Sequence, residues 1–285
     1  MTKILITGAN GQLGSELKEL SNKYPQYEFI FTDVDELDIC NKTAVFDFVS
    51  NEKPNFIVNC AAYTAVTKAE TDSELCYAIN RNAVRNLAET ANTINAKIIH
   101  ISTDYVFDGK GYLPYTENML INPQSVYGKS KAEGENALME TCKESIILRT
   151  SWLYSSFGNN FAKTMRKLGK ERETLSIIFD QIGTPTCAAD LAEAILKIID
   201  SGKFEAGIYH YSNEGVCSWY DFAKSIHKLS GITSCKTLPV ETKDYPDNTP
   251  RPFYSVLNKS KIKNVYGLDI PHWEESLAKC FEKLL

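Results

Sequence analysis

The chain has 285 residues, of which 43% are hydrophobic, and a formal net charge of −5. This length and composition fit one large globular domain, or a domain with a modest extra lobe, and allow a sizeable core. Because the sequence has neither a basic footprint for nucleic acid nor a polybasic segment for a membrane surface, a small-molecule substrate is favoured.

Short apolar runs rich in β-branched residues alternate with longer helical patterns in the first part of the chain. The runs that we expect to form strands are KILITG, EFIFTDVD, NFIVNCAA, KIIHISTDYVF and SIILRTSWLY. The helices expected between them cover residues 12–22, 43–51, 80–93 and 125–140. Near-continuous apolar strands separated by helices indicate a parallel sheet covered on both faces. The sequence therefore predicts an α/β fold with a Rossmann-type doubly wound parallel sheet.

The pattern is looser after residue 159. The expected elements are a helix over 161–170, a strand over 175–180, a helix over 188–199, the stretch GIYHYSN and helices over 219–229 and 273–284. Four prolines in residues 238–252 predict a long loop. We expect residues 159–285 to form mainly a smaller substrate-binding lobe. Residues 1–158, with returning segments from the second half, are expected to form the dinucleotide-binding domain.

The eight cysteines are scattered, without a CxxC pair or a histidine at metal-ligand spacing, so we expect reduced thiols. The sequence runs from Met1 directly into a strand pattern without an apolar signal region. Its apolar runs are all shorter than the roughly 18 residues needed to span a bilayer. We therefore expect a cytoplasmic protein.

A glycine-rich loop, GANGQLG, follows the first predicted strand and leads into a helix. Gly8, Gly11 and Gly14 give a tight turn, a close approach of backbone N–H groups to a pyrophosphate, and close packing of the helix on the sheet. The spacing is GxxGxxG, and such turns also join strands to helices without any ligand. Its position at the first βα turn favours a dinucleotide site.

An acidic residue, Asp33, ends the second predicted strand, about 20 residues after the loop, where a carboxylate binds the adenosine ribose hydroxyls. Such a carboxylate repels a 2′-phosphate and favours NADH over NADPH. The alternative is a solvated loop residue in an acidic run. Asp38 and Ile39 are candidates for contacts with the adenine amino group and ring.

Tyr127 and Lys131 are four residues apart in the helix predicted over 125–140, so they share one face. A free tyrosine has a pKa of about 10, and a nearby cation lowers it toward the range useful for acid–base catalysis. Lys131 could also hold the nicotinamide ribose. A lone YxxxK pattern is common on surfaces and in packing. Here, however, the fourth strand ends at Ser102, Thr103 and Asp104, where ligands bind in parallel sheets, although these hydroxyls could simply cap a turn.

Together these motifs resemble an extended short-chain dehydrogenase/reductase. The longer strings TDYVFDGKG, VYGKSKAEGE, LRTSW, GNNFAKTM, DQIGTPT and RPFYSVLN are similar to those of the dTDP-4-dehydrorhamnose reductase family, from Gly8 to about residue 258. The resemblance implies reduction of the 4-keto group of dTDP-4-dehydro-β-L-rhamnose by NADPH or NADH, for rhamnose and cell-surface polysaccharide biosynthesis.

The resemblance also implies roles for single residues. Tyr127 is the expected proton donor, Lys131 the residue that binds the nicotinamide ribose and lowers the tyrosine pKa, and Thr103 the third catalytic residue. The expected cofactor contacts are Gly8, Gly11, Gln12, Leu13, Asp33, Asp38, Ile39, Ala62, Tyr63, Thr64, Tyr127 and Lys131. The expected substrate contacts are Thr103, Asp104 and Trp152. Independently of the resemblance, Arg251 in the proline-bounded TPRPF is our candidate for a diphosphate contact, since a guanidinium can fork two phosphate oxygens.

Some family members form dimers bridged by Mg²⁺ through glutamates. Glu16 matches one such ligand, but Ala189 occupies the partner position, so we predict no metal site. We expect a monomer or a homodimer with no nucleic-acid or membrane partner. The alternatives are another nucleotide-sugar reductase, a 4-epimerase that retains its cofactor, and a non-catalytic regulatory subunit. Dehydration is disfavoured because Tyr105, not a second acid, follows Thr103-Asp104.

Overall fold

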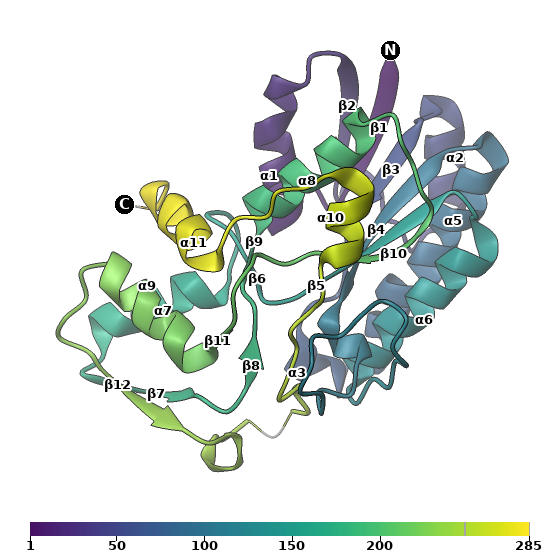
Figure 1. Cartoon of the computed structure of the whole chain (residues 1–285). Helices are drawn as coiled ribbons and strands as arrows, with labels where there is room; N and C mark the ends of the chain where they lie inside the picture. Colours follow the sequence, from purple (N-terminus) through teal and green to yellow (C-terminus); the bar gives the residue numbers. More distant parts are fainter. Residues whose placement is uncertain (248, 285) are drawn as a thin grey trace.

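The computed structural model describes residues 1–247 and 249–284; Asn248, inside the predicted proline-rich loop, and Leu285 lie outside the described residues. Six parallel strands form the main sheet in the order β10-β5-β4-β3-β1-β2 (Figure 1). They are β1 (Thr2–Thr7), β2 (Tyr27–Thr32), β3 (Phe56–Asn59), β4 (Lys97–Thr103), β5 (Ser145–Thr150) and β10 (Gly207–His210). Strand order reverses between β1 and β3, and ligands bind beyond the carboxyl ends of strands at such a point.

Helices cover both faces of this sheet, as the sequence predicts. One face packs against α2 (Lys42–Glu52), α5 (Ala83–Ile94) and α6 (Val126–Thr141), and the other against α1 (Gln12–Leu20), α8 (Ala188–Asp200) and α10 (Ser260–Tyr266). The doubly wound α/β fold is confirmed. Two short helices, α3 (Val66–Ala69) and α4 (Ser73–Tyr77), connect β3 to the α5 region.

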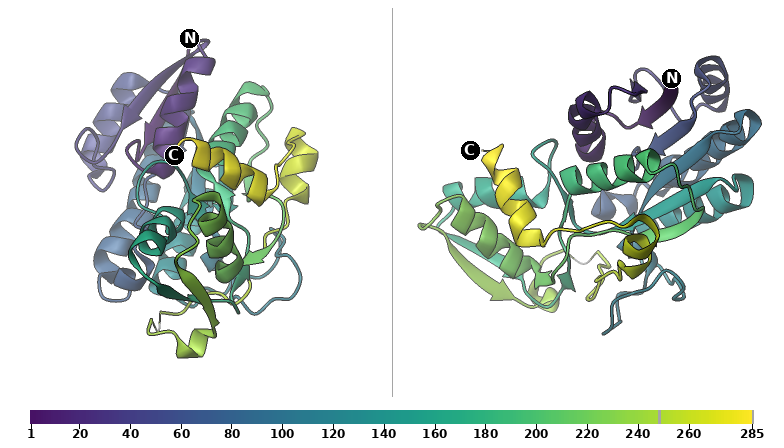
Figure 2. Two further views of the ribbon diagram at one scale, coloured as in Figure 1. Left: turned by 90° about the vertical axis from the view of Figure 1, so that its left-hand side faces the viewer. Right: turned by 45° about the horizontal axis from the view of Figure 1, so that its top comes forward.

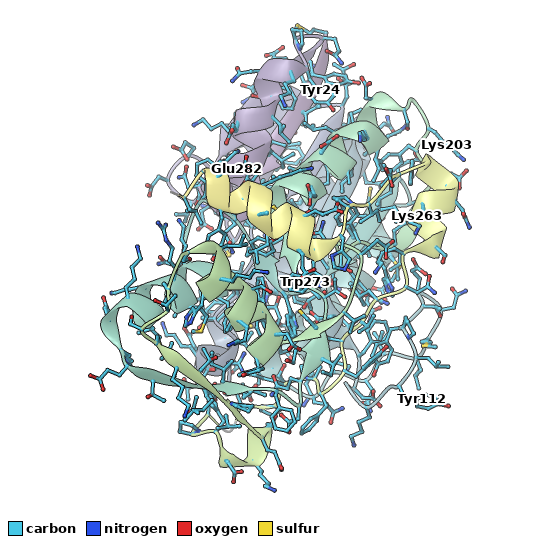
Figure 3. The ribbon with its side chains drawn as sticks, turned by 60° about the vertical axis from the view of Figure 1, so that its left-hand side comes forward. Tyr24, Tyr112, Lys203, Lys263, Trp273 and Glu282 are labelled. Atoms are coloured by element: carbon cyan, nitrogen blue, oxygen red, sulfur yellow. The ribbon has the colours of Figure 1, made fainter. Side chains whose placement is uncertain are left out.

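The second half builds a separate apolar cluster beyond the sheet (Figure 2). Its helices are α7 (Phe161–Glu171), α9 (Trp219–Leu229) and α11 (Trp273–Glu282). Its strand pairs are β6 (Leu153–Tyr154) with β9 (Thr186–Cys187), β7 (Thr174–Ile178) with β12 (Lys236–Val240), and β8 (Ile182–Gly183) with β11 (Cys217–Ser218). In Figure 3, α11 runs between this lobe and α1. Because α8 and β10 return to the main sheet, the exact division into residues 1–158 and 159–285 stays a prediction.

Two sequence expectations in this half are wrong. The predicted loop over 238–252 begins inside β12, which contains Pro239 and, within residues 1–247 and 249–284, pairs only with β7. Proline is tolerated there because an edge strand leaves one side without ladder hydrogen bonds. The sequence also misses α10, a seven-residue helix with no side-chain cap at its start and a single buried residue, Ile262. So short an element has little periodicity to detect.

A buried ion pair fixes α6 to β5. Glu135 accepts hydrogen bonds from Arg149 Nε at 2.9 Å and Arg149 Nη2 at 2.6 Å, and from Ser102 Oγ at 2.5 Å. The two charged side chains are only 1% and 2% exposed. This contact holds the helix that carries Tyr127 and Lys131 against the centre of the sheet.

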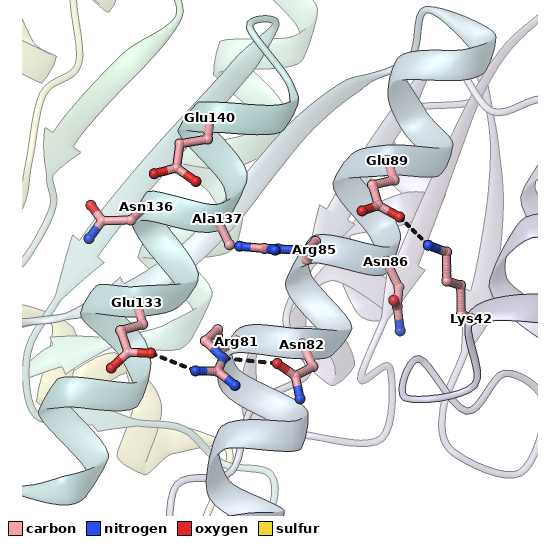
Figure 4. Close-up of a pocket in the computed structure, with 10 residues that line it drawn as sticks. All are labelled: Lys42, Arg81, Asn82, Arg85, Asn86, Glu89, Glu133, Asn136, Ala137 and Glu140. Atoms are coloured by element: carbon pink, nitrogen blue, oxygen red, sulfur yellow. Dashed lines mark hydrogen bonds and ion pairs between the residues drawn. The ribbon is translucent and has the colours of Figure 1, made fainter.

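Replacing Glu135 with alanine leaves the Arg149 guanidinium buried without its counter-charge, so we expect the free energy of unfolding to fall by about 3–5 kcal/mol. Glu133→Ala is the matched control, since the Arg81–Glu133 pair is 40% and 44% exposed (Figure 4). The control should lose at most about 1 kcal/mol. Urea denaturation measures both, and equal losses would contradict the importance of burial.

Candidate active site

Two adjoining cavities open at the carboxyl ends of the central strands, on either side of the glycine-rich loop. One, of about 610 Å³, is lined by Asp33, Asp38 and Ile39 among others, and the other, of about 470 Å³, contains the tyrosine and lysine. Both are lined by Gly8, Gly11, Cys60 and Ala62. The pair of cavities is shaped to take the two halves of a dinucleotide across the loop.

Two glycines of this loop, Gly8 and Gly14, are required by close packing. Gly8 has a φ of +66°, and a Cβ atom there would lie 2.6 Å from the backbone nitrogen of Ala61 on the neighbouring strand end. A Cβ atom on Gly14 would collide with the backbone of Gly8 and Ala9. The loop and the first turn of α1 are thereby pressed together, with Gly11 at the N-cap of the helix. That brings the positive end of the helix to the junction of the two cavities.

Asp33 lies at the rim of the larger cavity, where its carboxylate accepts hydrogen bonds from the backbone N–H of Asn10 at 2.9 Å and of Val34 at 2.8 Å. These bonds anchor a negative charge beside the glycine-rich loop. Asp38 accepts from the backbone of Cys40 at 2.9 Å and lines the same cavity with Ile39. The structure therefore brings all three expected adenosine-side residues to one cavity.

Tyr127 and Lys131 lie in the first turns of α6, which Ser125 caps by accepting from the backbone N–H of Gly128. The lysine Nζ donates to the backbone oxygen of Ile101 at 2.6 Å. Burial lowers the pKa of Lys131 to about 8, and the nearby Glu135 opposes this shift. The Tyr127 ring packs edge-on against Tyr105, with centroids 5.4 Å apart.

The direction of the Tyr127 shift differs from the sequence expectation. The spacing predicts a lowered pKa, but burial raises the pKa of Tyr127 above its ordinary value, and a hydrogen bond with Thr103 only partly opposes the shift. The phenol is thus held in its protonated form, which is the form that a proton donor needs.

The end of β4 supplies Thr103 and Asp104 to the same cavity. Thr103 Oγ1 donates to Asp104 Oδ1 at 3.0 Å and accepts from the backbone N–H of Tyr105 at 3.2 Å, so it also caps a turn. Asp104 Oδ2 is buried with no partner among the described residues. Burial raises the pKa of Asp104 to about 7. Ser102, by contrast, is engaged by Glu135.

Three other expected residues lie at the edges of the site. Trp152 lines the smaller cavity with a φ of +49° and stacks on Trp219 of the lobe at 3.6 Å between centroids. Tyr63 lines neither cavity: its hydroxyl donates to Asp72, and its backbone N–H to Asn80. Arg251 lines a third cavity of about 290 Å³, between α7, β7 and the segment that contains Tyr245 and Asp247.

Comparison with known proteins agrees with this geometry. A family model described as the RmlD substrate binding domain matches residues 1–285. The chain is 43% identical to the dTDP-4-dehydrorhamnose reductase of Aggregatibacter actinomycetemcomitans, with 97% of each chain covered. It is 42% identical to the spore coat polysaccharide biosynthesis protein SpsK of Bacillus subtilis (strain 168), covering 99% of this chain and 98% of SpsK. The chain belongs to the dTDP-4-dehydrorhamnose reductase family.

Solved structures of the family superpose closely. The dTDP-4-dehydrorhamnose reductase from Clostridium acetobutylicum ATCC 824 is 46% identical, with a TM-score of 0.94 and 99% of each chain covered. The dTDP-4-dehydrorhamnose reductase from Bacillus anthracis str. Ames, solved in complex with NADP, is 42% identical, with a TM-score of 0.95, and covers 99% of this chain and 100% of its own. The match therefore includes both the sheet and the lobe.

The Mg²⁺ bridge known from some members of the reductase family does not fit these residues. Glu16 is buried, accepts from Ser155 Oγ at 2.6 Å and lies 3.7 Å from the ammonium of Lys283. Ala189 offers no ligand atom at the partner position. Over residues 1–247 and 249–284, no group of three His, Cys, Asp or Glu side chains gathers at metal-binding distance. Likewise, no described helix is long and apolar enough to cross a membrane.

Sequence reasoning missed Asn160, which lines the smaller cavity and donates to Gln12 Oε1 at 3.0 Å. Its side chain also caps α7 through the backbone N–H of Lys163. The only sequence signal is its place in GNNFAKTM, one of the strings shared with the family. Asn160 ties the lobe to the glycine-rich loop.

The raised pKa of Asp104 predicts a pH-dependent stability. The folded protein keeps a proton up to about pH 7 that the unfolded chain releases near pH 3.8, so stability present at low pH is lost as the pH rises toward 7. Between pH 6 and pH 8, the wild type should lose about 1 kcal/mol relative to Asp104→Asn. Urea denaturation at both pH values measures this difference.

Asp108→Asn is the control for that experiment, because hydrogen bonding lowers the pKa of Asp108 and its titration falls below the tested window. The control and the wild type should show the same change in unfolding free energy between pH 6 and pH 8. If Asp104→Asn also follows the wild type, Asp104 does not titrate between pH 6 and pH 8 in the folded protein.

Proposed function

We propose that this protein reduces the 4-keto group of dTDP-4-dehydro-β-L-rhamnose to give dTDP-β-L-rhamnose, with NADPH or NADH as the reductant, in the supply of rhamnose for cell-surface polysaccharide. The observation that carries the proposal is the joint presence of Tyr127, Lys131 and Thr103 in a cavity that adjoins the glycine-rich loop. The likeness to named reductases over the whole chain supports it.

The nicotinamide dinucleotide supplies a hydride when bound. The carbonyl carbon C4 of the sugar gains that hydride, and the carbonyl oxygen must gain a proton as it becomes a hydroxyl. Tyr127 donates this proton from its phenol, which burial keeps protonated. Thr103, whose hydroxyl donates to Asp104 Oδ1, and Asp104 would orient the sugar, while Lys131 would hold the nicotinamide ribose and stabilise the phenolate that remains.

The two cavities divide the cofactor contacts between them. Asp33, Asp38 and Ile39 take the adenosine half, and Gln12, Leu13 and Thr64 line the smaller cavity with the two catalytic side chains. The anchored carboxylate of Asp33 favours NADH on grounds of charge, whereas the Bacillus anthracis relative binds NADP. Both reductants therefore belong in the assay. Tyr63 supports the site through Asn80 and Asp72 rather than by its side chain facing the cofactor.

Tyr127→Phe should lower kcat at least about a hundredfold, the lower range for loss of a general acid. The measurement is NADPH or NADH oxidation at 340 nm with dTDP-4-dehydro-β-L-rhamnose. Tyr154→Phe is the control, because that hydroxyl is buried in the lobe without a partner among the described residues. A Tyr127→Phe variant as active as this control would exclude Tyr127 as the proton donor.

Arg251 is our candidate for the contact with the substrate diphosphate. Its guanidinium bonds to Asp247 at 2.9 Å and reaches the Tyr105 hydroxyl at 3.4 Å, and its side chain is 30% exposed. It therefore lies beside the aromatic pair that borders the catalytic cavity and faces the neighbouring cavity of the lobe. A phosphate group that spans the two cavities would meet the free edge of the guanidinium.

Arg251→Ala should raise KM for the nucleotide-sugar about ten- to a hundredfold, the range of one or two charged hydrogen bonds, and leave KM for the dinucleotide nearly unchanged. Arg251→Lys keeps the charge but loses the fork, so its KM should be intermediate. Steady-state kinetics with each substrate varied in turn measures both constants. Equal increases in the two KM values count against this role.

The geometry of the site bears on neither the cellular location nor the oligomeric state of the protein. Cytoplasmic location and a monomeric or homodimeric state remain predictions. All eight cysteines are free in the structure, which agrees with reduced thiols.

A further inference from the structure

A row of buried polar side chains crosses the sheet beneath the active site and ends at Lys131. Thr7, Asn59 and His100 are register partners on β1, β3 and β4, so their side chains point to the same face. Each is at most 1% exposed, and Lys131 is 2% exposed. Thr7 Oγ1 donates to Asn59 Oδ1 at 2.7 Å, Asn59 Nδ2 lies 3.0 Å from His100 Nδ1, and His100 Nε2 lies 3.3 Å from Lys131 Nζ.

The orientation of the Asn59 amide is fixed by its neighbours. The backbone N–H of Ala61 can only donate, and it points at Asn59 Oδ1 from 3.2 Å. The amide oxygen therefore faces Thr7 and Ala61, and the NH₂ group faces His100. As a consequence, His100 Nδ1 has to accept a hydrogen bond.

His100 is neutral, because complete burial lowers its pKa well below the ordinary value, and any positive charge on the adjacent Lys131 lowers it further. A neutral imidazole carries one ring proton. Since Nδ1 accepts from Asn59, that proton is on Nε2, and the Nε2–H bond points at the amino group of Lys131. The tautomer thus follows from a main-chain donor at the end of the neighbouring strand, β3.

An N–H group that faces Lys131 discriminates between the two forms of the lysine. An ammonium has three donors and no acceptor, so it would meet His100 donor to donor. A neutral amine instead accepts from His100 with its lone pair and still donates to the Ile101 oxygen at 2.6 Å. The neutral form satisfies both contacts.

The other groups around Lys131 do not reverse this choice. Glu135, one turn further along α6, attracts an ammonium, but its carboxylate is occupied by Arg149 and Ser102. Cys76 of α4 has a raised pKa and is a neutral thiol near pH 7. Tyr127 is likewise held as a neutral phenol.

We propose that His100 is a positioning residue for Lys131: held as the Nε2–H tautomer by Asn59 and Thr7, it makes protonation of the lysine less favourable and holds the lysine nitrogen against the main chain of β4. The proposal goes beyond the proposed function and depends on it only for the catalytic role of Lys131. The pKa of Lys131, lowered to about 8, agrees with it.

The test is nuclear magnetic resonance of the whole protein without added ligand. The chain has only four histidines, so ¹⁵N-labelled rings can be assigned by single substitutions. We expect His100 to carry its proton on Nε2 alone between pH 6 and pH 8. With ¹⁵N-lysine, the Lys131 signal, identified by its loss in Lys131→Met, should titrate near pH 8.

The Asn59→Asp substitution should reverse the direction of the hydrogen bonds between residue 59, His100 and Lys131. A carboxylate accepts from Ala61, Thr7 and His100 together, which moves the imidazole proton to Nδ1 and turns the Nε2 lone pair toward Lys131. The titration midpoint of Lys131 should then rise by about one pH unit, the size of one net hydrogen bond. His210→Gln is the matched control: His210 is also fully buried, but it bonds to the Tyr115 oxygen, so both wild-type readings should persist.

Several outcomes would overturn the proposal. They are a wild-type His100 protonated on Nδ1, a wild-type Lys131 that titrates at the ordinary lysine value of about 10.4, an unchanged midpoint in Asn59→Asp, or an equal shift in His210→Gln. The two wild-type readings need no variant, so the test stands even if Asn59→Asp does not fold. Because no reading involves turnover, an inert enzyme with the expected spectra would reject the proposed function and leave this inference intact.

Discussion

The burial of the Lys131 amino group against the main chain of β4 is the constraint on which the site depends. An ammonium is costly to bury unless it is paired, and the side chain is only 2% exposed. The protein meets this constraint with a carbonyl acceptor at Ile101 and with the Nε2–H group of His100, which makes protonation of the lysine less favourable. The nearby carboxylate of Glu135 is paired with Arg149 and is therefore not available as the counter-ion of Lys131. The position of α6 follows from these contacts as much as from apolar packing.

The strand order of the main sheet positions both the glycine-rich loop and the polar row that ends at Lys131. Because β1 and β3 are neighbours, Gly8 can approach Ala61 closely enough to exclude a Cβ atom, and Thr7 can reach Asn59 one step earlier in the register. The point where the strand order reverses therefore positions both the glycine-rich loop at the carboxyl ends of the strands and the row of buried polar side chains beneath it. A change at Asn59 would therefore alter the surroundings of Lys131, although Asn59 lines neither cavity.

Periodicity and glycine spacing were sufficient for the main sheet and most of its helices, because β-branched runs and the GxxGxxG turn are local signals. They failed where an element is decided by distant contacts. Pro239 lies in β12 only because β7 offers an edge to pair with. Lys283 lies 3.7 Å from Glu16 although the two residues are far apart in the sequence, and no local sequence pattern predicts this contact. The pKa direction of Tyr127 was also missed, since spacing reveals the neighbouring lysine but not the extent of burial.

Burial pushes the three titratable groups nearest the chemistry toward their neutral forms. The pKa values of Tyr127 and Asp104 rise, and that of Lys131 falls. Near pH 7 the Tyr127 phenol is therefore neutral and the Asp104 carboxyl partly protonated, whereas Lys131 still carries most of its positive charge. A nucleotide-sugar and a dinucleotide nevertheless bring several phosphate charges, and these must be met outside the cavity. The N-terminus of α1 borders the catalytic cavity and Arg251 lines the neighbouring cavity of the lobe, so our proposal separates phosphate binding from proton transfer in space.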